Sequence, residues 1–157
     1  MKQKKKMEKV SQNISIKEAV HSNTATKKGI KNVPNLTQLK SMKLVAEKVF
    51  EPVRNHFAVA IGISSFFRTV ELNKLIGGSA TSQHCKGEAI DMDADIHGRL
   101  TNAQIFLWIK DNLEFDQLIW EYGTDSEPDW VHCSYKSKGN RNQILVAKKG
   151  EKYTPYK

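Results

Sequence analysis

Two short strings in the sequence bring together side chains that can bind a metal ion. The string SQHCKGEAID contains His84 and Asp91, and the later string DWVHCS contains His132. Neutral imidazole and carboxylate groups are good zinc ligands, and three protein ligands leave a fourth coordination position for water, as catalytic sites require. The residue types therefore predict a catalytic metal site, provided that the chain turns at Gly87 and lets His84 and Asp91 converge.

Spacing alone leaves other roles open, because a lone histidine in a small protein is more often a surface or core residue than a ligand. Cys85 and Cys133 each follow one of these histidines, but they form no CxxC pair, so a cysteine zinc site is not expected. Cys133 alternates with His132 along an expected strand and should point the other way, into the core. His21 and His97 lie outside both strings and are expected at the surface.

The two strings also follow a known pattern, S-x-H-x-x-G-x-A-x-D and then W-x-H-x-S. The residues that match it are Ser82, His84, Gly87, Ala89, Asp91, Trp130, His132 and Ser134. In this pattern the chain resembles the zinc D-Ala-D-Ala carboxypeptidases and their relatives, a peptidase M15-like group. That group includes D-Ala-D-Ala dipeptidases and the L-alanyl-D-glutamate endopeptidases of phage endolysins. The resemblance extends over roughly residues 35–150 and includes the run SSFFRTVELNKLIGGSATSQH.

The resemblance implies a role for each matching residue. His84, Asp91 and His132 match the zinc ligands, and Asp129 matches the catalytic carboxylate. Many relatives have Glu at that position, while some, notably of the endopeptidase type, have Asp. The implied reaction is metal-assisted hydrolysis, in which zinc lowers the pKa of water from about 16 to about 7. Asp129 would then take a proton from the water and deliver it to the leaving amine.

Three further residues are implied to meet the substrate. Arg68 matches the family arginine that polarises the scissile carbonyl or binds substrate, and it would stabilise the developing oxyanion. Ser82 matches a residue that lines the substrate pocket. Ser134, which belongs to the second motif, is also expected to bind substrate. Glu121 and Tyr122 end an expected strand and could rim the cleft.

The elements that must position these residues indicate an α+β fold. N-terminal helices are expected to pack on a small antiparallel sheet that carries the zinc site, as in the D-Ala-D-Ala peptidase/hedgehog-like fold. Residues 22–34 are expected to form a loop, and Pro52 should kink or shorten the long helix. Helices are expected at about 15–21, 36–55, 70–76 and 101–112, and strands at 57–67, 89–94, 116–122, 130–135 and 143–148.

Length and charge limit the remaining possibilities. The 157 residues fit a disordered basic tail at 1–13 and one peptidase domain at 14–157, expected to be a monomer. The net charge of +8 is unevenly spread, with +4 at residues 1–9, −2 at residues 10–135 and +6 at residues 136–157, so the basic character lies in the two ends. No secretory signal is visible, so synthesis in the cytoplasm is expected, with a holin as a route to the cell wall. No stable membrane association is expected.

Three functions can be weighed against the motifs and the charge of the sequence. A zinc peptidase acting on peptidoglycan stem peptides, either a D,D-carboxypeptidase, an endopeptidase or a cytoplasmic D,D-dipeptidase, agrees with all the motifs. A zinc-bound module that only binds peptidoglycan would have no need for a carboxylate such as Asp129 beside an open metal. A nucleic-acid binder would need aromatic residues among the basic ones, yet the aromatic residues lie mostly in expected strands.

Overall fold

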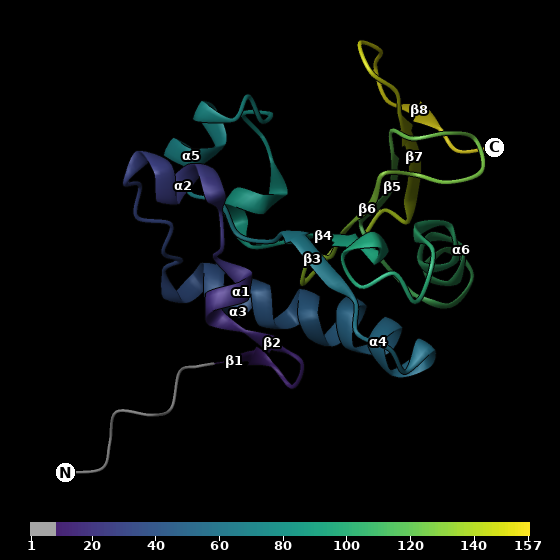
Figure 1. The fold of residues 1–157 in the computed structure, drawn as a ribbon, viewed down its shortest axis with the longest axis horizontal. Helices are drawn as coiled ribbons and strands as arrows, with labels where there is room; N and C mark the ends of the chain where they lie inside the picture. Colours follow the sequence, from purple (N-terminus) through teal and green to yellow (C-terminus); the bar gives the residue numbers. More distant parts are fainter. Residues whose placement is uncertain (1–8) are drawn as a thin grey trace.

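The computed structural model describes residues 9–157, and it opens with a small hairpin that precedes two short helices (Figure 1). The elements are β1 (Lys9–Ser11), β2 (Ile14–Ser15), α1 (Ile16–Ala19) and α2 (Asn23–Lys28). Residues 9–13 therefore depart from the expected disordered tail, and residues 1–8 of that tail lie outside the described part. Val10 and Ile14 are buried in the core, and the Glu51 carboxylate accepts hydrogen bonds from Ser11 and Asn13.

Helix α2 was not expected, because residues 22–34 contain no apolar periodicity. Its ends are set by local chemistry. The Ser22 side chain accepts a hydrogen bond from the Ala25 amide, and Gly29 ends the helix in the left-handed conformation. The short loop after α2 is held by Asn32, whose amide nitrogen donates to the carbonyls of Val20 and Phe67.

The long helix runs through Pro52 instead of ending before it. Its parts are α3 (Leu36–Val45), the π-helical turn η1 (Ala46–Phe50) and α4 (Glu51–Phe57). Asn35 and Gln38 form the capping box that begins it. Pro52 lies in the first turn of α4, and the Glu51 amide donates to the Ala46 carbonyl, five residues back. The wider turn thus accommodates the proline that the sequence analysis expected to kink or shorten the helix.

A six-stranded sheet forms the centre of the molecule, in the order β3-β4-β6-β5-β7-β8. Its strands are β3 (Gly62–Ser65), β4 (Ala89–Asp93), β5 (Gln117–Glu121), β6 (Trp130–Ser134), β7 (Gln143–Ala147) and β8 (Thr154–Pro155). The fold is α+β, as expected, but the expectation of an antiparallel sheet was wrong for this sheet. It is mixed, because β7 passes to the far side of β5 and pairs with it in parallel. Of the two sheets at residues 9–157, the small β1–β2 hairpin is the purely antiparallel one.

The other helical elements of residues 9–157 are short except for α6. They are α5 (Val70–Leu75), the 3-10 turns η2 (Gln83–Lys86) and η3 (Ala94–Ile96), and α6 (Asn102–Asn112). Strand β3 is shorter than expected, since the long helix continues to Phe57 and ends at Ala58 in the left-handed conformation. None of the helices at residues 9–157 is long and apolar enough to cross a membrane.

One face of the sheet packs on helices, and this leaves the other face for polar side chains. Helices α3 and α6 contribute buried side chains such as Met42 and Phe106 to the core. From the sheet, Met92, Leu118 and Val131 belong to the same core. Successive strand residues point to opposite faces, so the neighbours of these core residues in the chain emerge on the other side. That side carries the predicted metal site.

Candidate metal centre

Two paired strands bring Asp91 and His132 together. Strand β4 pairs with β6 in antiparallel register, and Asp91 lies directly opposite His132. Their neighbours Ile90 and Cys133, also opposite each other, are both buried in the core. Cys133 therefore points away from the metal site, as its alternation with His132 predicted, and burial raises its thiol pKa above 9, the usual value.

His84 reaches the same place from the 3-10 turn η2. The turn ends at Gly87, which has a positive φ of 72° and whose amide donates to the His84 carbonyl. A Cβ at Gly87 would lie 2.5 Å from the Gln38 carbonyl oxygen and 2.8 Å from Met42 Cγ. Both the left-handed backbone and the close approach to α3 require glycine here. The predicted turn at Gly87 is thus present.

The three side chains point their donor atoms at one another. The Asp91 carboxylate lies 3.3 Å from His84 Nε2 and 2.9 Å from His132 Nδ1, and all three donor atoms lie within 4.8 Å of one another. His84 Nδ1 lies 2.6 Å from the Phe66 carbonyl oxygen. A carbonyl only accepts, so Nδ1 carries a proton, and Nε2 is the nitrogen that faces Asp91. This orientation is that of a metal-ligating histidine.

The residues fit a zinc ion. Two nitrogen or oxygen ligands at about 2.0–2.1 Å from a tetrahedral zinc lie about 3.4 Å apart. The separations of 2.9 and 3.3 Å between Asp91 and the two histidines are close to this value. Burial alone would raise the pKa of Asp91, but the two histidines beside it hold that pKa well below its usual range. Asp91 is therefore ionised, as a ligand must be. His84, Asp91 and His132 form a group that could hold a metal ion.

A cavity of about 510 Å³, here called the central cavity, opens over this group. Arg68 and Ser82, predicted from the sequence, both line it, and Arg68 donates hydrogen bonds to the hydroxyls of Ser65 and Ser82. Arg68 Nε is buried and has no hydrogen-bond partner at residues 9–157. The structure thus brings Arg68 and Ser82 to the metal site.

Glu121 is a carboxylate of the central cavity that the sequence analysis placed only at the cleft rim. It ends β5, where it pairs with Trp130 of β6, and it is 6% exposed. No hydrogen bond or ion pair to its side chain occurs in the described part of the chain. Burial, with the Asp91 charge adding to it, raises the pKa of Glu121 to about 7, against the opposing effects of His132 and Arg68. A carboxyl group of this kind can exchange a proton near neutral pH.

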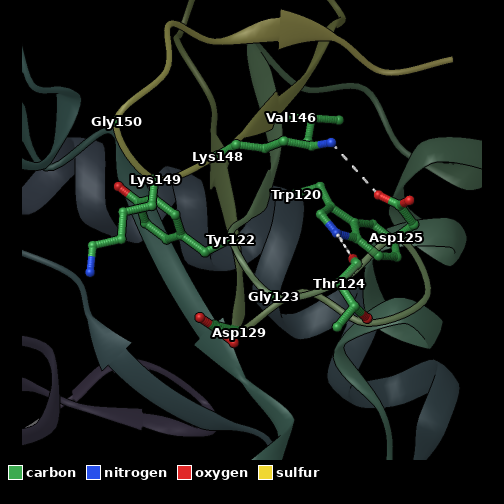
Figure 2. A pocket seen from close by; sticks show the side chains of 10 residues that line it. All are labelled: Trp120, Tyr122, Gly123, Thr124, Asp125, Asp129, Val146, Lys148, Lys149 and Gly150. Atoms are coloured by element: carbon green, nitrogen blue, oxygen red, sulfur yellow. Dashed lines mark hydrogen bonds and ion pairs between the residues drawn. The ribbon is translucent and has the colours of Figure 1, made fainter.

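The two other predicted residues lie elsewhere. Asp129 is exposed, and its side chain lines a neighbouring cavity of about 850 Å³ together with Tyr122 and Lys149 (Figure 2). Only its backbone amide reaches toward the site, by donating to the Glu121 carbonyl. Ser134 is fully buried and accepts a hydrogen bond from the Gln117 amide. Neither Asp129 nor Ser134 lines the central cavity.

The buried carboxylate of Asp116 holds the turn η2, which carries His84. Asp116 accepts a hydrogen bond from Gln83, the residue before His84, and forms ion pairs with Arg141 and Lys136. Burial alone would raise the pKa of Asp116, but these two cations lower it to about 2. Asp116 therefore stays ionised and links η2 to β5 and to the start of β7.

The comparison with protein families agrees with this geometry. The model of the family described as Peptidase M15 matches residues 12–134, which is well over half of the chain and includes all three candidate ligands. A comparison with curated proteins finds no match. The matched region also contains Arg68, Ser82, Glu121 and Asp129. The chain therefore belongs to the peptidase M15 family.

Proposed function

We propose that this protein is a zinc-dependent peptidase that hydrolyses peptidoglycan stem peptides. The observation that carries the proposal is the buried group of His84, Asp91 and His132 at the floor of an open cavity, in a chain of the peptidase M15 family. Three ligands leave room for water, which distinguishes a catalytic from a structural zinc site. A bound zinc ion would supply Lewis acidity, which lowers the pKa of water from about 16 to about 7 and polarises a carbonyl.

The chain's own residues provide binding and proton transfer around that group. The guanidinium of Arg68 lines the central cavity and would hold the scissile carbonyl oxygen as negative charge develops on it. Ser82 and Ser65 fix the guanidinium in position by accepting its hydrogen bonds. Tyr153 lines the same cavity.

We assign the general base to Glu121 and retain Asp129 as the competing candidate. Glu121 lies in the cavity with the ligands, is buried, and has no hydrogen-bond or ion-pair partner for its side chain at residues 9–157, so its carboxyl group is free to exchange a proton with a water there. It would take a proton from the attacking water and give it to the leaving amine. Asp129 has the sequence position of the family carboxylate but lies exposed in the neighbouring cavity.

The substrate rests on the resemblance of the two motifs to enzymes that act on cell-wall peptides. The same resemblance to phage endolysin peptidases supports a role in cell-wall lysis. A module that binds peptidoglycan without cleaving it is the second candidate. The free carboxylate of Glu121 beside the ligand group favours the enzyme, since a binding site gains nothing from an unpaired acid there.

The test is mass spectrometry of purified muropeptides after incubation with the protein, with a chelator, and again after zinc is restored. We expect cleavage that stops with the chelator and returns with zinc. His132→Ala should lose zinc by elemental analysis and lose cleavage, because two ligands cannot hold the ion as three do. His97→Ala, which removes an exposed histidine outside the site, should keep both. Bound zinc without any cleavage would favour the binding module instead.

A further inference from the structure

One residue of the central cavity comes from a part of the chain that the family model does not match. The residues after 134 lie beyond the matched region, and they form β7, β8 and the hairpin 148–153 between them. Figure 1 shows this hairpin as the yellow loop at the top of the view. Tyr153, its last residue, lines the central cavity together with the three candidate ligands and Glu121. Tyr153 belongs to neither sequence motif, so no role has been assigned to it.

Tyr153 and Arg68 lie on opposite sides of the metal-ligand group. Arg68 follows β3 and donates a hydrogen bond to Ser65 of that strand. Tyr153 directly precedes β8, at the other end of the sheet order β3-β4-β6-β5-β7-β8. Two of the candidate ligands lie on β4 and β6, between these two positions. The central cavity therefore has a guanidinium on one side of the ligands and a phenol on the other.

The hairpin that carries Tyr153 is anchored to the rest of the fold. Thr154, the next residue, lies opposite Val146 where β8 pairs with β7. Tyr156 packs its ring against the buried Phe106, with 4.9 Å between the ring centroids. These contacts begin one residue after Tyr153, so the backbone on that side of it has a defined place beside the cavity.

The phenol of Tyr153 is free to meet a ligand. Its side chain is 57% exposed, and none of the hydrogen bonds at residues 9–157 involves its hydroxyl. Burial raises the pKa of Tyr153, and the nearby Glu121, Tyr122 and Asp91 raise it further. The hydroxyl therefore keeps its proton at neutral pH and is available as a hydrogen-bond donor. The exposed ring adds an apolar face of the kind that ligand cavities commonly present.

We propose that Tyr153 is a substrate-binding residue whose hydroxyl donates a hydrogen bond to a backbone carbonyl of the peptide in the central cavity. This inference rests on the proposed function and adds a recognition residue to it. A peptide carbonyl only accepts hydrogen bonds, and with Tyr153 the cavity offers it a donor on the side away from Arg68. A hydrogen bond made equally in the bound substrate and in the transition state lowers KM and leaves kcat unchanged.

Tyr153→Phe tests the contact, because it removes the hydroxyl and keeps the ring. With the zinc-loaded protein and a synthetic stem pentapeptide, we expect KM to rise about threefold to tenfold, the value of one hydrogen bond, and kcat to stay nearly constant. Zinc content and urea unfolding should not change, since Tyr153 is exposed and is not among the candidate ligands. An unchanged KM would overturn the inference, and so would a fall in kcat at constant KM, because the hydroxyl would then act in the chemical step.

Tyr156→Phe is the matched control. It removes a hydroxyl from the same segment at a position that does not line the central cavity, and it keeps the ring that packs on Phe106. We expect its KM and kcat to match those of the unmodified protein. An equal rise of KM in Tyr156→Phe and Tyr153→Phe would mean that the segment has shifted, and the direct contact would be rejected.

The proposed function can fail separately from this inference. If the unmodified zinc-loaded protein binds the pentapeptide without cleaving it, the peptidase assignment is rejected, and calorimetric titration of the same proteins decides the role of Tyr153. A Kd that is about threefold to tenfold larger for Tyr153→Phe supports the contact, and an equal Kd overturns it. A protein that neither binds nor cleaves the peptide would reject both the function and the contact.

Discussion

At the scale of single residues, the sequence motifs predicted the three metal ligands, whereas the position of Glu121 depends on how the strands pair. His84, Asp91 and His132 were found because their types and spacing match a zinc pattern, and the structure brings them together. Glu121 has no such signal, since it lies in a different strand from each of them. Its approach to the ligands depends on the register of β5 against β6, which pairs Glu121 with Trp130. Sequence patterns give the faces of strands but not which strands become neighbours.

The first prediction at this scale concerns Glu121 and Asp129, the two candidates for the general base. Glu121→Gln keeps the shape of the side chain but cannot accept a proton, so activity should fall by about 10²–10⁴-fold, the usual contribution of general acid–base catalysis. Zinc content should stay unchanged, since Glu121 is not among the three candidate ligands. Kinetics on a muropeptide with elemental analysis of the same samples measure both quantities.

Asp129→Asn is the matched variant, because it makes the same chemical change in the exposed carboxylate of the neighbouring cavity. We expect it to retain most of the activity. If Asp129→Asn instead lost activity while Glu121→Gln kept it, the base would be Asp129, as its sequence position implies, and our assignment of Glu121 would be wrong.

At the scale of secondary structure, local signals predicted most elements, and long-range pairing decided the rest. The helices expected to start at residues 15 and 101 are present, and the structure shows why they start there: Ser15 and Thr101 cap α1 and α6. Two features differ from the expectation, and each has a physical cause. A π-helical turn directly before Pro52 lets the long helix continue through the proline. The parallel pairing of β7 with β5 joins segments that are not consecutive strands in the chain. Neither feature leaves a periodic pattern in the sequence.

Gly87 gives a prediction at this scale, because it joins the histidine turn to α3. Gly87→Ala adds the strain of a positive φ and a methyl group that meets the Gln38 carbonyl at 2.5 Å. Together these should cost about 2–4 kcal/mol of unfolding free energy and shift η2, so that zinc affinity falls as well. Urea unfolding and zinc titration measure the two effects.

Gly139→Ala is the control for backbone strain alone. Its φ of 73° is nearly the same as that of Gly87, but an added Cβ would have no atom within 4 Å. We expect a cost of about 1 kcal/mol and unchanged zinc affinity. Equal losses in the two variants would mean that the contact between Gly87 and α3 does not position His84.

At the scale of the whole molecule, some basic side chains of the C-terminal segment form ion pairs within the fold, and others are exposed without such a pair in the described part of the chain. The C-terminal segment 136–157 has a net charge of +6. Within it, Lys136 and Arg141 pair with the buried Asp116, and Lys148 lies 3.8 Å from Asp125. Lys138 and Lys152 are exposed and form no ion pair in the part of the chain described by the structure. Free cations of this kind attract a polyanion without contributing to the fold.

The last prediction follows from this division. If the free cations hold the enzyme on an anionic wall, activity on intact cell walls should fall steeply between about 0.05 and 0.3 M salt, because screening shortens the reach of surface charges. Activity on a small soluble muropeptide should change little over the same range, since the buried ligand group is screened much less by salt. The double variant Lys138→Gln, Lys152→Gln should weaken the salt response on walls and leave the soluble assay unchanged, because neither side chain lines the central cavity. The same salt response on both substrates would show that salt acts on the enzyme itself, and the free cations would then have no part in holding the wall.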